Sequence, residues 1–186
     1  NTSAKIAQAD PLTGTIEMVL WVKGSGGDLG SMDIAGFSTL YLSKLEKLKE
    51  LYRGLAFEDE MVGLLPHCTF NLNPRAASID TPLHAYIPHA HVDHMHPDAV
   101  IAIASTVNSR ELTEAIWGAE MGWLPWQRPG FDLGLRLEQI ATVNPHYRGV
   151  ILEGHGLFTW GDSSKSCYEN TLATIQQAAD WLARNN

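Results

Sequence analysis

The pattern of hydrophobic and polar positions in the first half of the chain predicts a strand and then a helix. Residues 16–23 read IEMVLWVK, a short, partly β-branched apolar run, and glycine-rich residues 24–30 follow. This pattern predicts a strand that ends in a turn. Within residues 40–54 leucines recur at helical spacing, so we predict a helix that stops at Gly54. Those leucines are Leu42, Leu45, Leu48 and Leu51. For residues 55–80 we predict irregular structure, including a loop with the sequence NLNPRAAS.

The second half predicts more helix than strand. The apolar run at 100–104 fits a buried strand or a buried helix, because periodicity does not separate the two. Asn108 and Glu111 have capping-box spacing before a helix, and a loop rich in Pro and Trp follows at 122–130. The remaining predicted elements are a helix at 132–143, two short strands within 149–161 that flank residues 154–156, and a helix at 163–184.

The last of these helices is amphipathic. Its predicted apolar face carries Leu172, Ile175, Ala179 and Leu182. Strands and helices therefore alternate irregularly along the chain, which predicts a mixed α/β layer fold.

Composition narrows the class of protein. The chain has 186 residues, 45% of them hydrophobic and 18% charged, which fits one globular domain. The net charge of −8 argues against a nucleic-acid or anionic-membrane partner. No apolar run approaches the roughly 18 residues of a membrane span. The start has no apolar segment of the kind that a signal peptide contains. It also lacks an initiator Met, so we expect part of a longer chain. Two cysteines make no disulfide framework, which favours the reducing cytoplasm.

Histidines supply the first candidate chemistry. The chain has eight, and five lie between positions 84 and 96: His84, His89, His91, His94 and His96. In a strand, residues i and i+2 point the same way, about 6.5–7 Å apart. His94 and His96 could therefore hold one divalent metal ion, and the pair His89 and His91 has equal spacing.

Spacing alone leaves the histidine chemistry open. A catalytic zinc usually takes three protein ligands, and His155, flanked by two glycines, is the distant candidate. The other interpretations are a solvated polar loop and a metal-sequestering cluster of His89, His91, His94 and His96.

The glycine-rich turn, KGSGGDLG, comes directly after the first predicted strand. A dinucleotide-binding fingerprint would need a third glycine where Leu29 stands, so that interpretation fails. Free backbone N–H groups, the Ser25 hydroxyl and the nearby Lys23 could still hold a phosphate. An ordinary turn at the end of a strand is the alternative.

Five segments together carry a resemblance to a known family. They are NTSAK, VLWVKGSGGDLG, NLNPRAASIDTPLHAYIPH, HVDHMHPDA and GVILEGHGLFTWG. With them the chain resembles the class II aldolase/adducin superfamily over nearly its whole length. It is most similar to the aldolase part of bifunctional rhamnulose-1-phosphate aldolase/alcohol dehydrogenase proteins. The resemblance implies one domain over residues 1–186, with a three-layer α/β/α fold around a central, mainly antiparallel sheet.

The resemblance also assigns residues to roles. It implies that a divalent metal, usually zinc, is bound by His94, His96 and His155 rather than by His89 and His91. It implies that Asp80 is the catalytic carboxylate, at a position where the family usually has the longer glutamate. The implied phosphate-binding residues are Asn1, Ser25, Gly26 and Ser78, while Ile79 stands where relatives have a second serine.

The implied reaction is metal-dependent retro-aldol cleavage of a ketose 1-phosphate similar to L-rhamnulose 1-phosphate. Its products would be dihydroxyacetone phosphate and an aldehyde such as L-lactaldehyde. The metal would stabilise the enediolate that cleavage leaves, by several kcal/mol. The resemblance implies a homotetramer and, beyond residue 186, a dehydrogenase domain. Alternatives in the superfamily are a sugar-phosphate 4-epimerase, a dehydratase, and a non-catalytic adducin-like interaction domain that would have lost its metal site.

Overall fold

The computed structural model describes residues 1–185 and divides the chain into two compact units. Unit 1 comprises Asn1–Pro88 and Pro129–Glu138, and unit 2 comprises His89–Arg128 and the chain from Gln139 onward. Each unit has its own hydrophobic core. None of the helices in the described residues is long and apolar enough to cross a membrane.

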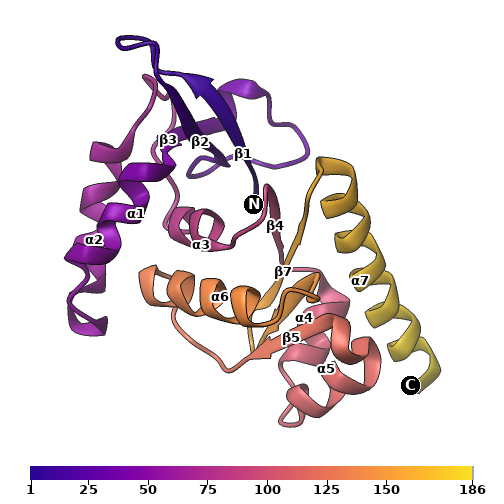
Figure 1. The fold of residues 1–186 in the computed structure, drawn as a ribbon. Coiled ribbons are helices and arrows are strands. Elements are labelled where there is room, and N and C mark those ends of the chain that lie inside the picture. Colours follow the sequence, from indigo (N-terminus) through magenta and orange to yellow (C-terminus); the bar gives the residue numbers. More distant parts are fainter. Residues whose placement is uncertain (186) are drawn as a thin grey trace. The chain divides into compact units, whose positions relative to one another are not determined.

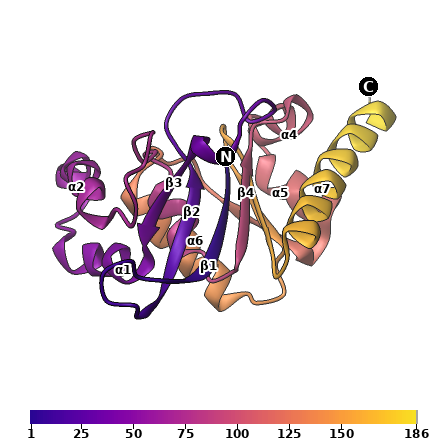
Figure 2. The ribbon, with the colours of Figure 1, turned by 90° about the horizontal axis from the view of Figure 1, so that it is seen from above.

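Unit 1 contains an antiparallel sheet with helices packed against it (Figures 1 and 2). Its strands are β1 (Thr2–Ala9), β2 (Ile16–Lys23) and β3 (Phe37–Tyr41), with β2 in the middle. Its helices are α1 (Leu42–Leu51), α2 (Glu58–Leu64), α3 (Thr81–Tyr86) and the first part of α6 (Phe131–Val143). Short 3-10 helices cover Ile34–Gly36, Leu55–Phe57 and Leu65–Cys68.

The core of unit 1 forms where β2 meets α1. Leu20 and Val22 of β2 are fully buried and pack with Leu45 and Leu48 of α1. The register of β2 and β3 pairs Val22 with Ser38, which fixes where β2 ends and the glycine-rich turn begins. The predicted strand at 16–23 and the turn after it are confirmed, whereas the predicted leucine helix ends at Leu51, before Gly54.

Unit 2 contains a four-stranded sheet in the order β4-β7-β6-β5. The strands are β4 (His91–Met95), β5 (Met121–Leu124), β6 (Gly149–Leu152) and β7 (Gly156–Gly161). Its helices are α4 (Asp98–Ala104), α5 (Ser109–Trp117) and α7 (Ser164–Asn185), and a 3-10 helix covers Gly118–Glu120. Strands β5 and β6 pair in parallel. The other strand pairs within each unit, over the described residues, are antiparallel.

Four sequence-based expectations need correction. Residues 55–68 are helical rather than irregular, because Met61 and Leu65 turn into the core of unit 1. The strand β5 occupies the start of the expected Pro/Trp loop. The apolar run at 100–104, for which the pattern left strand and helix open, is the helix α4. Asn108 stands at the N-cap position of α5, but its side chain makes no capping hydrogen bond.

The fourth correction concerns the buried face of α7. Leu172 is 47% exposed, whereas Cys167, Thr171, Thr174 and Ala178 are buried. Small and β-branched side chains let the helix lie close to β7, and the threonine hydroxyls hydrogen-bond to carbonyl groups one turn earlier in α7. Ile175 and Leu182 do pack on the core of unit 2, as expected.

Candidate metal centre and glycine-rich turn

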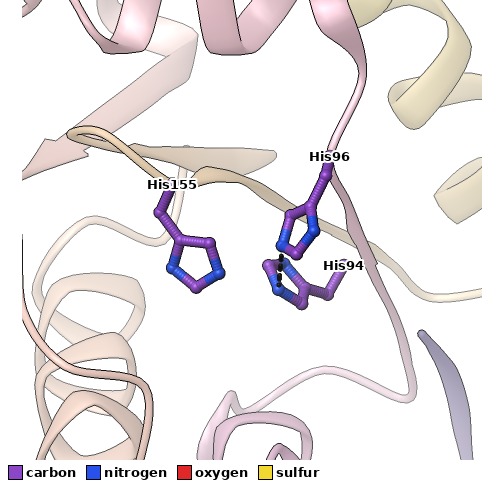
Figure 3. Close-up of side chains that lie close together, drawn as sticks. All are labelled: His94, His96 and His155. Atoms are coloured by element: carbon purple, nitrogen blue, oxygen red, sulfur yellow. Dashed lines mark hydrogen bonds between the residues drawn. The ribbon is translucent and has the colours of Figure 1, made fainter. Parts of the chain in front are cut away.

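Three histidines of unit 2 converge from two segments of the chain (Figure 3). His94 lies in β4, His96 directly follows that strand, and His155 lies in the turn between β6 and β7. One ligand nitrogen from each ring lies within 4.8 Å of the others. Among the histidine, cysteine and acidic side chains of the described residues, these three lie close enough together to hold one metal ion.

The pairing of β4 with β7 brings these residues together. Their antiparallel register sets His94 opposite Phe158 and Met95 opposite Leu157. The backbone N–H of His155 donates to the carbonyl of Leu152 at 3.1 Å, and this hydrogen bond closes the turn. Gly154 within that turn has φ 61°, a conformation that glycine adopts without strain.

His94 is held in a defined orientation. Its Nδ1 lies 2.9 Å from the carbonyl oxygen of Leu157, which can only accept a hydrogen bond, so Nδ1 carries the proton. Its ring stacks on Phe158, with 4.1 Å between ring centroids. The lone pair of the neutral imidazole is therefore on Nε2, which faces the other two histidines.

The geometry fits a divalent transition metal. Nε2 of His94 and Nε2 of His96 are 3.0 Å apart. Two nitrogens bound to a tetrahedral ion at 2.0–2.1 Å would be about 3.3 Å apart, so this pair is already close to the spacing that such an ion requires. Imidazole nitrogen is a common ligand for zinc and its neighbours in the first transition row.

The competing pair, His89 and His91, is not part of this cluster. The His89 ring stacks on Trp160 with 5.4 Å between centroids, and its Nδ1 lies 3.7 Å from a carboxylate oxygen of Asp162. His84 is fully buried in unit 1, where its Nδ1 lies 2.8 Å from the hydroxyl oxygen of Ser3.

The predicted catalytic carboxylate, Asp80, belongs to unit 1 and directly precedes α3. Although Asp80 occupies the N-cap position, its side chain makes no capping hydrogen bond. Instead its carboxylate accepts hydrogen bonds from the Asn1 amide and, at 3.4 Å, from the Ser78 hydroxyl. The structure therefore brings together three of the predicted residues, Asn1, Ser78 and Asp80.

The glycine-rich turn contains the other two predicted residues of unit 1, Ser25 and Gly26. The backbone N–H of Ser25 donates to the carbonyl of Ala76 at 2.9 Å, so the turn is joined to the loop that leads to Asp80. Lys23 donates to the carbonyl of Gly26 at 2.9 Å and to that of Gly24 at 3.3 Å. The ammonium group that the sequence offered as a phosphate ligand thus closes the turn itself.

Sequence reasoning missed one cation at this turn. Arg75, the one charged residue of the NLNPRAAS loop, lines a cavity of about 640 Å³ together with Gly26 and Gly27. A lone cation in a predicted loop was the available signal, but only the fold shows that this loop meets the glycine-rich turn.

Comparison with known proteins now gives the family. Residues 1–182 match the family described as Class II Aldolase and Adducin N-terminal domain. The chain belongs to this family. The resemblance to the class II aldolase/adducin superfamily is therefore confirmed.

Solved structures of class II aldolases share the fold. The N-terminal class II aldolase domain of a conserved protein from Thermoplasma acidophilum is 29% identical, with a TM-score of 0.87 over 97% of this chain and 82% of that chain. An L-fuculose 1-phosphate aldolase has a TM-score of 0.62 at 11% identity, over 100% of this chain and 76% of that chain. The latter likeness shows the fold alone. The predicted mixed α/β, class II aldolase-like fold is confirmed.

A curated relative is longer than this chain. The uncharacterized oxidoreductase YuxG of Bacillus subtilis (strain 168) is 41% identical over 182 residues, which are 98% of this chain and 26% of YuxG. The chain thus spans about a quarter of that relative. Class II aldolases depend on divalent metals, and the three clustered histidines offer this class II aldolase domain a site for one.

Proposed function

We propose that this class II aldolase domain cleaves a ketose 1-phosphate similar to L-rhamnulose 1-phosphate by a metal-dependent retro-aldol reaction. The products would be dihydroxyacetone phosphate and an aldehyde such as L-lactaldehyde. The observation that carries the proposal is the convergence of His94, His96 and His155 in a chain of the class II aldolase family.

Cleavage breaks the bond between C3 and C4 of the ketose. The C4 hydroxyl loses a proton, the electron pair of the broken bond stays on the ketone fragment, and C3 takes up a proton. A divalent ion, which we propose to be Zn²⁺ held by the three imidazoles, would supply a Lewis acid that lowers the energy of this charge. The hydrogen bond between His94 Nδ1 and the carbonyl of Leu157 would leave Nε2 of His94 to bind such an ion.

Asp80 is the proposed general acid/base that moves these protons. Its carboxylate is hydrogen-bonded by two neutral groups, the Asn1 amide and the Ser78 hydroxyl, and not by a cation. Neutral donors orient the carboxylate without holding it in an ion pair, which supports this role.

The phosphate would be bound by Asn1, Ser25, Gly26 and Ser78. Two of them, Asn1 and Ser78, also contact Asp80, so phosphate binding and the position of the carboxylate would be coupled. Binding energy from the phosphate would then orient the reacting carbon atoms.

We further propose that residues 1–186 act as one domain in a cytoplasmic homotetramer. The two thiols, Cys68 and Cys167, are free and buried, which fits a reducing compartment. Because YuxG carries the name oxidoreductase and is much longer, we propose that a linked dehydrogenase oxidises the aldehyde in the full-length protein.

Other reactions of the superfamily would use the same histidines. A 4-epimerase or a dehydratase differs in its product, so product analysis separates them from an aldolase. The non-catalytic, adducin-like alternative predicts a lost metal site, and the intact cluster of three histidines disfavours it.

The test is an assay of the purified, metal-loaded protein with L-rhamnulose 1-phosphate. Dihydroxyacetone phosphate should form, formation should stop with a chelator, and added Zn²⁺ should restore it. L-fuculose 1-phosphate and L-ribulose 5-phosphate serve as parallel substrates. A protein that binds one equivalent of metal but cleaves none of the three would contradict the aldolase proposal, and a new isomer of L-ribulose 5-phosphate would favour the epimerase.

A further inference from the structure

A cavity of about 640 Å³ opens beside the glycine-rich turn of unit 1. Gly26, Gly27 and Arg75 line one part of it, and the loop at 28–36 lines much of the rest. The turn itself is built from two successive residues with positive φ, 71° at Gly26 and 78° at Gly27. In the part of the chain that the structure describes, the N–H groups of these two glycines donate to no other residue. Two backbone donors are therefore available to a ligand.

The guanidinium of Arg75 lies flat over Gly27. A β-carbon built on Gly27 would be 3.6 Å from Cζ of Arg75 and 3.7 Å from both Nη atoms, and these nearly equal distances mean that the plane faces the glycine. The N–H groups of a guanidinium radiate within that plane, so they extend sideways over the turn. A side chain at position 27 would take up this space.

The backbone of Arg75 is fixed to the turn. Ser38 donates a hydrogen bond to the carbonyl oxygen of Arg75 at 2.9 Å, and the N–H of Ser25 donates to the carbonyl of Ala76 at 2.9 Å. A β-carbon on Gly24 would come within 2.8 Å of Cβ of Arg75, so the two segments touch at that glycine. The backbone of Arg75 is thus anchored beside the turn before any ligand arrives, so binding has only the side chain of Arg75 to order.

The two cations at the turn differ in their bonding. Lys23 is hydrogen-bonded to the carbonyls of Gly24 and Gly26 and does not line the cavity. No hydrogen bond or ion pair joins the Arg75 guanidinium to another of the described residues. Arg75 is therefore the cation that faces the cavity with its donors available.

Two carboxylates, Asp28 and Asp33, also line the cavity. Asp28 accepts hydrogen bonds from the N–H of Gly30 and the hydroxyl of Ser31, which lower its pKa below the ordinary value. Asp33 accepts from the N–H of Ala35 at 3.0 Å. Both carboxylates thus hold the 28–36 loop in shape, and neither forms an ion pair with Arg75 among the described residues.

We propose that Arg75 is a specificity-determining residue that binds the phosphoryl group of the substrate, together with the hydroxyl of Ser25 and the N–H groups of Gly26 and Gly27. This inference rests on the proposed function for its substrate class, a phosphorylated rather than a free ketose. A planar guanidinium can donate two parallel hydrogen bonds to a phosphate, and the nearby backbone N–H groups can bind its remaining oxygens. Arg75 contributes to binding and takes no part in proton transfer.

The first experiment measures binding of inorganic phosphate by calorimetry and does not depend on catalysis. Arg75→Ala should weaken phosphate binding roughly 10- to 100-fold, because a charge-assisted pair of hydrogen bonds is lost. The phosphate affinity of Arg75→Lys should lie between those of wild type and Arg75→Ala, since lysine keeps the charge but lacks the two parallel donors of arginine. Arg53→Ala is the matched control: Arg53 is an exposed arginine of unit 1 that pairs with Glu60, and its loss should leave phosphate affinity unchanged.

The second experiment compares KM and kcat for a ketose 1-phosphate and for the free ketose. Arg75→Ala should raise KM for the phosphorylated sugar by the same factor by which it weakens phosphate binding, with kcat nearly unchanged. Neither KM nor kcat for the free sugar should change. Phosphate affinity within twofold of wild type in Arg75→Ala, or an equal loss in Arg53→Ala, would overturn the proposal. If phosphate binding depends on Arg75 but no ketose phosphate is cleaved, the anion site stands and the proposed aldolase reaction fails.

Discussion

The carbonyl oxygen of Met95 lies 2.5 Å from the position that a β-carbon would occupy on Gly156. The same β-carbon would be 2.7 Å from Cδ2 of His96. Glycine at this position lets the start of β7 approach the end of β4. The turn that carries His155 is thereby brought against the strand end that carries His94 and His96.

Gly156→Ala should therefore damage the metal centre through the backbone. The added methyl group cannot fit without shifting β4 or β7, and we expect a loss of about 1–3 kcal/mol in the free energy of unfolding, together with weaker metal binding. Gly63→Ala is the matched control, because nothing lies near a β-carbon at that exposed helical position. It should stabilise the protein by about 0.5–1 kcal/mol. Urea unfolding and metal titration of both variants measure these effects, and a Gly156→Ala protein as stable as Gly63→Ala would refute the argument.

Metal binding should depend on His155 and not on His89. His155→Ala removes one of three clustered imidazoles, so we expect affinity for Zn²⁺ to fall on the order of 100-fold or more, since even outer-shell changes cost 10–100-fold. His89→Ala should bind as wild type does, because the His89 ring stacks on Trp160 outside the cluster. Competition with a chromophoric chelator measures both affinities. Unchanged affinity in His155→Ala would instead favour a cluster of the histidines at 89–96.

Asp80→Asn should separate catalysis from binding. The amide keeps the shape of the carboxylate but cannot take up a proton at neutral pH, so kcat should fall roughly 10²- to 10⁴-fold. Metal content should be unchanged, since the candidate ligands are the three histidines. Asp162→Asn, the same replacement at a side chain that is 99% exposed, serves as the control for kcat. A variant at position 80 that retains wild-type kcat would exclude Asp80 as the general acid/base.

Lys5 in β1 should give unfolding a specific pH dependence. Burial lowers the pKa of Lys5 from 10.5 to about 8, and its ammonium group donates a hydrogen bond to the carbonyl of Ile87. Between pH values of about 8 and 10.5 the unfolded chain keeps the proton on Lys5 while the folded chain has lost it. The free energy of unfolding therefore increases as the pH rises through this interval. Relative to Lys5→Met, wild type should gain up to about 3 kcal/mol across that interval.

The measurement is urea unfolding of wild type and Lys5→Met at several pH values between about 7 and 10.5. Tyrosines and cysteines that titrate in the same range are common to the two proteins, so their effects cancel in the difference. A difference that stays constant over the whole range would show that Lys5 keeps an ordinary pKa in the folded protein.

Local sequence patterns were sufficient to predict a strand where its residues are continuously buried or where glycine ends it. The strand at 16–23 was predicted with the bounds that the structure shows, and the strands within 149–161 were predicted with the turn between them. The pattern predicted irregular structure for residues 55–68 and left residues 100–104 open between strand and helix. The run at 100–104 is apolar throughout and has no periodicity that separates a helix from a strand, and each segment becomes helical by packing on partners elsewhere in the chain.

The sequence by itself determined the donors: imidazoles in His-x-His spacing, a third histidine between glycines, a carboxylate at position 80 and a glycine-rich turn after a buried strand. Its resemblance to class II aldolases chose His94 and His96 over His89 and His91. Only the tertiary structure decided which donors meet. The register of β4 and β7 sets His94 near His155, and the packing of Arg75 against Gly24 sets a cation over the turn. Such contacts join residues about 50 or more positions apart, and they form only when the strands and loops pack together, which no local pattern encodes.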